Sequence, residues 1–223
     1  MFAVSFRLVV SMFFALCMGA TAFAANCGTG KVLLQDDFAT LSPVWNIAKG
    51  DDIKNGPKGL EATVAKGKSI YGLNQSGLFN DYEVCLTAKA AVKCTKKDSC
   101  EASGFFGVLF WGADNKNYYS CDASPAYATS AVFRLQNNKF ITPVGWAAVP
   151  DGGLPKLTQD FVTVSATVKG NHLTCKVNGV VTAEIDGFPP DGGSLFGFEV
   201  GSQSSDTENS LFTVKHIELR DVQ

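Results

Sequence analysis

The chain has 223 residues, of which 46% are hydrophobic, and its 19 basic and 21 acidic side chains give a net charge of −2. No stretch gathers basic residues into the stripe that a phosphate backbone requires, so we expect no nucleic-acid partner. No low-complexity tract, internal repeat or proline- and serine-rich linker divides the chain, and its length is ample for one hydrophobic core.

The first residues have the pattern of a secretory signal peptide. Arg7 precedes an apolar run over residues 8–19, and Ala22-Phe23-Ala24 follows as a cleavage site. The run is shorter than the roughly 18–20 apolar residues that cross a membrane. We therefore predict a signal peptide over residues 1–24. The mature chain, 25–223, is expected to form a single domain that is secreted or periplasmic and does not insert into a membrane.

Short alternating segments dominate the mature chain, and no window sustains an amphipathic helical period. Asn178-Gly179 is a strong hairpin signal, since both residues tolerate a positive φ, and Asn137-Asn138 joins another expected hairpin. The expected strands are, in chain order, Lys31–Gln35, Gly59–Ala65, Ser69–Leu73, Tyr82–Lys89, Phe105–Trp111, Tyr118–Ala123, Ala131–Leu135, Lys139–Pro143, Phe161–Val168, Leu173–Val177, Val180–Ile185, Leu195–Val200 and Leu211–Leu219. This series predicts an all-β fold of two antiparallel sheets packed as a sandwich. The 17 phenylalanines suit such a core.

Six cysteines remain once Cys17 leaves with the signal peptide, and an even number in an exported protein predicts three disulfides. Cys94 and Cys100 flank a polar loop and can close a local bridge across it. A metal site is the rival interpretation of these two residues, but no histidine neighbours the loop. We therefore predict a Cys94–Cys100 disulfide.

The other four cysteines allow three pairings. Cys121 and Cys175 lie within expected strands and can join neighbouring strands. This choice leaves Cys27 to tie the N-terminal segment to Cys85.

Five segments together resemble a known group of proteins. They are Asp36-Asp37-Phe38 with Trp45, DYEV at Asp81–Val84, GVLFWGADNKNYY at Gly107–Tyr119, VNG at Val177–Gly179 and FTVKHIELRD at Phe212–Asp221. In this order they resemble the concanavalin A-like (laminin G-like) superfamily, and within it the 3-keto-disaccharide hydrolase-like (DUF1080) group of bacterial exported proteins. The resemblance implies a jelly-roll sandwich that hosts lectins, glycosidases and adhesive modules. Ser103–Val108 lacks the asparagine and arginine that the group carries there, which weighs against inherited hydrolase activity.

Glu184 and Asp186 have the spacing that laminarinase-like retaining glycosidases use on one strand, where it places both carboxylates on one sheet face. However, Pro189-Pro190 stands where those enzymes carry a third carboxylate. We expect Glu184 and Asp186 to be solvent-facing strand residues and assign no catalytic residue. No Ser/His/Asp triad is readable around His172 or His216.

Glycan binding requires aromatic rings at an exposed sheet face or rim, with polar neighbours for the hydroxyl groups. The residues that we expect to bind a glycan are Trp111, Asp114, Asn117, Tyr119, Arg134 and Trp146. Trp111 ends an expected strand and Trp146 follows a proline-containing turn, so either ring can lie at a rim. Arg134 is a charged residue within a strand, which must face solvent, a groove or an acidic partner. Core packing is the alternative for any single ring.

Calcium is the cofactor for which the sequence offers ligands, and we expect no other. Hard oxygen atoms gather in two loops, at Asp114, Asn115 and Asn117 and at Asp206, Glu208 and Asn209. Loops also use aspartate and asparagine simply to make turns.

Three functions fit these observations. We favour an exported carbohydrate-binding or adhesive module without catalytic activity, with a glycan or saccharide as its ligand. An alternative is a glycoside hydrolase acting on a small saccharide or a 3-keto-glycoside, which requires two carboxylates, or a carboxylate and a histidine, in one groove. A second alternative is a structural domain of the cell envelope that binds a protein partner through a flat apolar patch.

Overall fold

The computed structural model describes residues 27–48, 52–96 and 99–222. The expected signal peptide, residues 1–24, lies outside them. The described part consists of strands β1 to β16 and two short 3-10 helices, η1 (Pro43–Trp45) and η2 (Pro150–Gly152). Among the helices of these ranges, none combines the length and the apolar character needed to cross a membrane.

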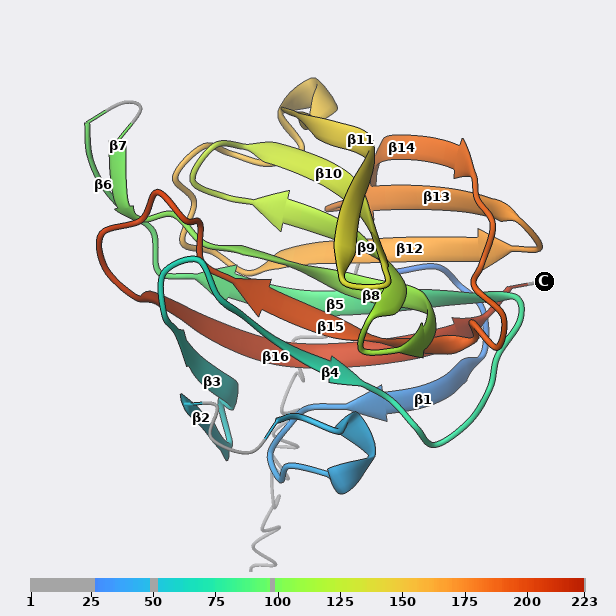
Figure 1. Ribbon diagram of the computed structural model, residues 1–223. Coiled ribbons are helices and arrows are strands. Elements are labelled where there is room, and N and C mark those ends of the chain that lie inside the picture. Colours follow the sequence, from blue (N-terminus) through green and yellow to red (C-terminus); the bar gives the residue numbers. More distant parts are fainter. Residues whose placement is uncertain (1–26, 49–51, 97–98, 223) are drawn as a thin grey trace, which may run out of the picture.

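Two large antiparallel sheets pack against each other, as Figure 1 shows, which confirms the predicted all-β sandwich. The eight-stranded sheet has the order β14-β13-β12-β5-β16-β3-β2, and β1 also pairs with β16. Its strands are β1 (Val32–Asp36), β2 (Asp52–Gly56), β3 (Gly59–Val64), β5 (Tyr82–Ala90), β12 (Val162–Lys169), β13 (His172–Val177), β14 (Val180–Asp186) and β16 (Ser210–Asp221).

The six-stranded sheet has the order β11-β10-β9-β8-β15-β4. Its strands are β4 (Ser69–Leu73), β8 (Phe105–Asp114), β9 (Asn117–Ser124), β10 (Thr129–Gln136), β11 (Lys139–Ala148) and β15 (Leu195–Gly201). A separate ribbon pairs β6 (Lys93–Lys96) with β7 (Ser99–Ala102).

The core lies between the two large sheets, because alternate residues of each strand face inward. On β8, Phe106, Val108 and Phe110 are fully buried in it, and β5 contributes Val84 and Leu86 from the opposite sheet. Burial of each such side chain stabilises the fold by about 1.5–3 kcal/mol. The inward residues of β8 therefore form part of the core, and its outward residues form part of the outer face of the six-stranded sheet.

Three disulfides join Cys27 to Cys85, Cys94 to Cys100 and Cys121 to Cys175, which confirms the predicted number and the Cys94–Cys100 bridge and selects one of the three pairings left open for the other four cysteines. The expectation that the third bridge joins neighbouring strands is wrong. Cys121 lies on β9 and Cys175 on β13, so this bridge crosses the core from one sheet to the other. Both residues point inward from strands that face each other, a relation that adjacency in the sequence does not reveal.

Strand β11 is the main departure from the predicted strands. It runs from Lys139 to Ala148 and does not end at Pro143. As an edge strand it tolerates a proline, since a missing N–H there leaves no ladder bond unmade. The short strands β2, β6 and β7 were not predicted, because their mostly polar residues carry little strand signal.

Candidate functional site

The outer face of the six-stranded sheet carries two acidic residues side by side. Asp122 on β9 and Glu199 on β15 each lie directly opposite Gly107 on the intervening strand β8. Inward residues alternate with them, so both carboxyl groups project from the outer face. Gly107 has no side chain, and a Cβ there would collide with Asp122 Oδ1. The glycine thus leaves open the space over β8 in which the two carboxyl groups meet.

The two carboxyl groups are buried and share a hydrogen bond. Asp122 is 0% and Glu199 is 3% exposed. Ser120 Oγ donates to Asp122 Oδ2 at 2.8 Å, whereas the buried Asp122 Oδ1 has no other donor among the described groups. Burial raises the pKa of Asp122 well above its usual value, and the neighbouring Glu199 charge raises it further. Burial also raises the pKa of Glu199.

Two carboxylates this close cannot both ionise at little cost, so the pair retains a proton where isolated carboxyl groups have lost theirs. Burial raises the pKa of both carboxyl groups, and Asp122 Oδ1 has no hydrogen-bond donor among the described groups, so the two residues share that proton as a pair. The pair then carries a single negative charge.

Four aromatic rings surround this pair. Phe105, Phe133, Phe140 and Trp146 line a pocket of about 170 Å³ together with the carboxyl pair, Ser69 and Gln203. The ring of Trp146 lies 6.1 Å from that of Phe105 and 5.6 Å from that of Phe133, both edge-on. Phe133 also lies 6.2 Å from Phe140. Phe140 is 67% and Trp146 is 38% exposed, so the outer part of the pocket is open to solvent.

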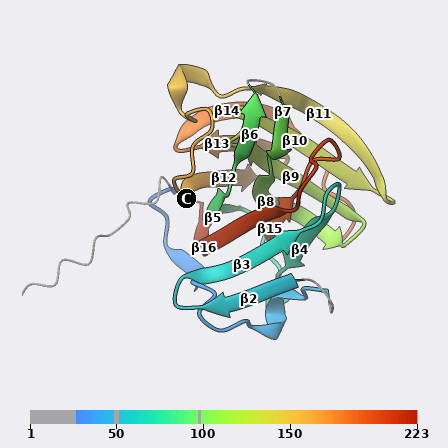
Figure 2. The ribbon, with the colours of Figure 1, turned by 90° about the vertical axis from the view of Figure 1, so that its left-hand side faces the viewer.

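The bends of the edge strand β11 explain why the side chain of Trp146 points into this pocket. β10 pairs Ser130 with Ala147, Val132 with Val144 and Arg134 with Ile141. From each of these pairs to the next, β10 advances by two residues and β11 by three. This extra residue marks a bulge in β11 at each of the two places. Bulges bend a strand and redirect its side chains, and Figure 2 shows β11 as the long curved yellow strand at the edge of the sheet.

An apolar cluster covers the opposite side of the carboxyl pair. It consists of Leu73, Leu109, Tyr118 and Leu135, all buried on the outer face of the sheet. Burial raises the pKa of Tyr118, and the charges of Glu199 and Asp122 raise it further. The pair therefore lies between a closed apolar cluster and an open aromatic pocket.

Two of the predicted ligand-binding rings lie in the core. Trp111 is 2% and Tyr119 is 3% exposed, and their rings pack edge-on at 5.2 Å. The backbone N–H of Trp111 donates to the hydroxyl of Tyr82 on β5, so this hydrogen bond links the two sheets across the core. The expectation that Trp111 lies at a rim is wrong. Of the adjacent tyrosines, Tyr118 faces the carboxyl pair and Tyr119 faces the core.

Three predicted polar residues also lie elsewhere. Arg134 projects from the other face of β10, with its guanidinium 5.1 Å from the centre of the Tyr119 ring. Asp114 accepts hydrogen bonds from the Lys116 N–H at 2.7 Å and from Asn117 Nδ2 at 3.0 Å within the β8–β9 turn. The Lys116 bond is the main cause that lowers the pKa of Asp114. Of the predicted ligand-binding residues, Trp146 is the one that lines the pocket.

Glu184 and Asp186 are exposed residues of β14, at the edge of the opposite sheet. His172 Nδ1 lies 2.9 Å from Asp186 Oδ1 across the β13–β14 hairpin. Both carboxylates face solvent, as expected.

The aspartates expected to bind calcium already have partners within their loops. Asp206 is buried and accepts hydrogen bonds from backbone or side-chain groups of Ser103, Ser202, Gln203 and Ser210. Such a carboxylate organises its loop, and a cation would have to displace these donors. Asn115, an exposed residue of the β8–β9 turn, stays an untested candidate.

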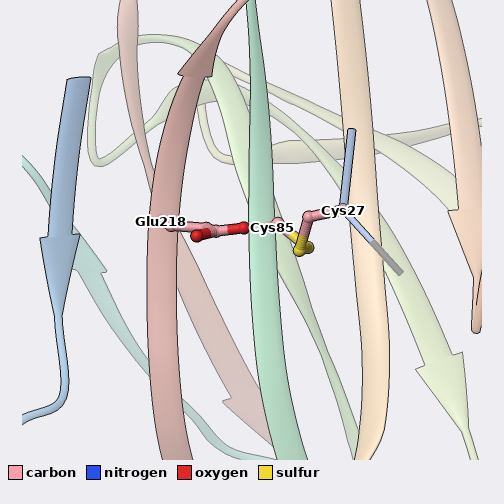
Figure 3. Close-up of side chains that lie close together, drawn as sticks. All are labelled: Cys27, Cys85 and Glu218. Atoms are coloured by element: carbon pink, nitrogen blue, oxygen red, sulfur yellow. A yellow bond between two sulfur atoms is a disulfide. The ribbon is translucent and has the colours of Figure 1, made fainter. Parts of the chain in front are cut away.

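Within the described ranges, one cluster combines three side chains of metal-binding type, Cys27, Cys85 and Glu218, which Figure 3 shows. The two cysteines form a disulfide, so neither offers the thiolate that a metal site requires.

Asp122 and Glu199 were missed by the sequence reasoning, although a signal for them exists. Each is a charged residue in the interior of a strand, and β15 is otherwise apolar, which is the same argument that singled out Arg134. Gly107 is a second signal, because a glycine inside a strand often marks a close approach of other groups.

Comparisons with known proteins extend this description. No protein-family model matches the chain, and no curated protein matches its sequence. Among solved structures, the carbohydrate-binding module CBM66 from Bacillus subtilis is 12% identical with a TM-score of 0.52, over 75% of this chain and 91% of that one. A Bacillus licheniformis beta-glucanase is 8% identical with a TM-score of 0.58, over 87% and 100%. A Crh5 transglycosylase in complex with NAG is 13% identical with a TM-score of 0.55, over 89% and 87%.

At these identities the likeness concerns the fold. The chain has the same jelly-roll sandwich fold as these structures, which is the fold that the sequence resemblance implied. The narrower DUF1080 assignment stays a prediction.

Proposed function

We propose that this chain is an exported, non-catalytic glycan-binding module whose binding site is the pocket under Trp146. The observation that carries the proposal is the open group of aromatic rings on the outer face of the six-stranded sheet, with hydrogen-bonding groups at its base. Ligand sites typically combine aromatic walls with a few convergent polar groups. Here Glu199, Asp122, Ser69 and Gln203 supply the polar groups, and Trp146 and Phe140 supply accessible rings.

The shape of the site fits a saccharide. About 170 Å³ is less than the roughly 300–1,000 Å³ of pockets that enclose drug-sized ligands. A single sugar ring entering an open pocket, with neighbouring units resting on the exposed rings, matches this size. The fold supports the proposal, since solved structures with the same sandwich include a carbohydrate-binding module.

Export is part of the proposal. The three disulfides are of the kind that persist in oxidising compartments outside the cytoplasm. Together with the signal peptide expected over residues 1–24, they support a secreted or periplasmic location.

Glycoside hydrolysis is the second candidate, because buried carboxyl groups with raised pKa values cluster at catalytic sites. The arrangement of this pair weighs against it. Retaining glycosidases hold their two carboxyl groups about 5–5.5 Å apart with the sugar between them, and inverting enzymes hold theirs further apart. Asp122 and Glu199 instead lie opposite the same residue, Gly107, within hydrogen-bonding reach of each other, which is closer than either arrangement. If a glycan that binds is also cleaved, and Glu199→Gln abolishes cleavage while binding persists, the hydrolase replaces the binding module.

A glycan array probed with the oxidised mature chain tests the proposal, with and without calcium. We expect specific binding that Trp146→Ala removes. Phe188→Ala is the matched control, because Phe188 is a 72% exposed aromatic residue outside the pocket lining. Binding that is unaffected by Trp146→Ala, or lost equally in both variants, would refute this location of the site.

A further inference from the structure

The charge of the pocket is entirely negative. Among the residues that the structure describes, its lining contains two acidic side chains, Asp122 and Glu199, and no lysine, arginine or histidine. Burial, the two carboxyl groups themselves and the Ser120 hydroxyl set the titration of the pair. Within the described part of the chain, the negative charge is therefore not neutralised by a basic residue of the lining.

Like the negative charge, the aromatic walls of the pocket favour a positively charged ligand. The face of an aromatic ring carries negative potential and attracts ammonium groups, most strongly for tryptophan. Phe105, Phe133 and Trp146 pack edge-on around the pocket, and Phe140 extends the wall outward. Aromatic rings around a carboxylate form the kind of cage that recognises organic cations.

Asp122 provides a specific acceptor inside this cage. The residue is fully buried and lines the pocket, and its Oδ1 atom has no hydrogen-bond partner among the described groups. An ammonium group has three N–H donors. It can replace the shared proton by donating to Asp122 and to Glu199, while that proton passes to solvent.

We propose that the pocket selects saccharides that carry a free, protonated amino group, with the ammonium group seated between the aromatic rings and the Asp122–Glu199 pair. This inference rests on the proposed function and gives it a substrate class. A neutral hydroxyl or acetamido group in the same place leaves the buried negative charge without a counter-ion, which is costly. A sugar carboxylate adds repulsion.

The test compares two ligands that differ only at nitrogen. Titration calorimetry measures binding of the glucosamine tetrasaccharide and of the N-acetylglucosamine tetrasaccharide, slightly below neutral pH so that the amine is charged. We expect the free amine to bind at least tenfold more tightly. Titration in two buffers of different ionisation enthalpy should also show proton release for the amine and none for the acetylated ligand.

Variants separate the pair from the rest of the pocket. Glu199→Gln keeps the side-chain shape and removes one charge, so it should reduce the ratio of the two affinities from at least tenfold in favour of the amine to about one. Glu184→Gln, at an exposed carboxylate of β14 in the other sheet, is the matched control and should retain the preference.

The outcomes distinguish the inference from the function on which it rests. Equal or tighter binding of the acetylated ligand at the Trp146 pocket overturns the amine preference and leaves glycan binding intact. If choline binds there and neither saccharide does, the cation cage stands and the glycan function fails. If none of the three ligands binds, both fail.

Discussion

The disulfide across the core allows a quantitative prediction. Cys121 and Cys175 are separated by 54 residues in the sequence and join the two sheets. In the loop-entropy treatment, closing a loop of this length restricts the unfolded chain by about 4 kcal/mol. We expect Cys121→Ala/Cys175→Ala to lower the free energy of unfolding by about that amount, a large part of the 5–15 kcal/mol of a typical domain.

The other two bridges serve as internal standards. Cys27–Cys85 spans 58 residues and should be worth nearly the same, about 4 kcal/mol, whereas Cys94–Cys100 spans 6 and should be worth only about 2 kcal/mol. Urea denaturation of the three double-alanine variants, each compared with the oxidised wild type, measures the order. A smaller loss for the core bridge than for Cys94–Cys100 would refute the reasoning from loop length.

The remaining predictions concern the charged groups of the two sheets and the glycine between the buried carboxyl groups. Folding raises the pKa values of Asp122 and Glu199, so the folded state binds more protons than the unfolded state, and the free energy of unfolding should fall as pH rises from about 4 through the pKa values of the folded pair. The double variant Asp122→Asn/Glu199→Gln should remove this decline and be more stable than the wild type at neutral pH. Denaturation at a series of pH values measures both effects. Gly107→Ala should lower stability by about 1–3 kcal/mol and weaken ligand binding, because its Cβ displaces Asp122 Oδ1 and the Cys121 carbonyl; unchanged melting would contradict the close approach. Burial would raise the pKa of Glu218, but hydrogen bonds from His216 and Arg220 lower it to about 2. The stabilisation from the ionised Glu218 carboxylate should therefore be present above about pH 4.5 and lost toward pH 2. Glu218→Gln should lower the free energy of unfolding at neutral pH and make no difference near pH 2.

Much of the architecture followed from local pattern. Strand β5 alternates cleanly, and Asn178 and Gly179 both adopt a positive φ at the β13–β14 turn, as the hairpin signal requires. The cysteine count and its context predicted three disulfides, and the short spacing predicted the Cys94–Cys100 bridge. These features depend on composition or on residues close in sequence, whereas the pairing of the other four cysteines was decided by the tertiary structure.

The candidate site depended on relations that no local pattern contains. β9 is buried on both faces, so alternation could not say which of Tyr118 and Tyr119 faces the core. The two bulges that carry Trp146 to the pocket arise from how β11 pairs with β10.

Asp122 and Glu199 lie on the two strands that flank β8, each opposite Gly107. Because this glycine has no side chain, the two carboxyl groups can approach each other over β8. Sequence determined that this chain folds as a disulfide-linked β-sandwich, since periodicity and turn chemistry are local. Only the tertiary structure decided which acidic and aromatic side chains share a pocket, because strand order and register bring together residues that are far apart along the chain.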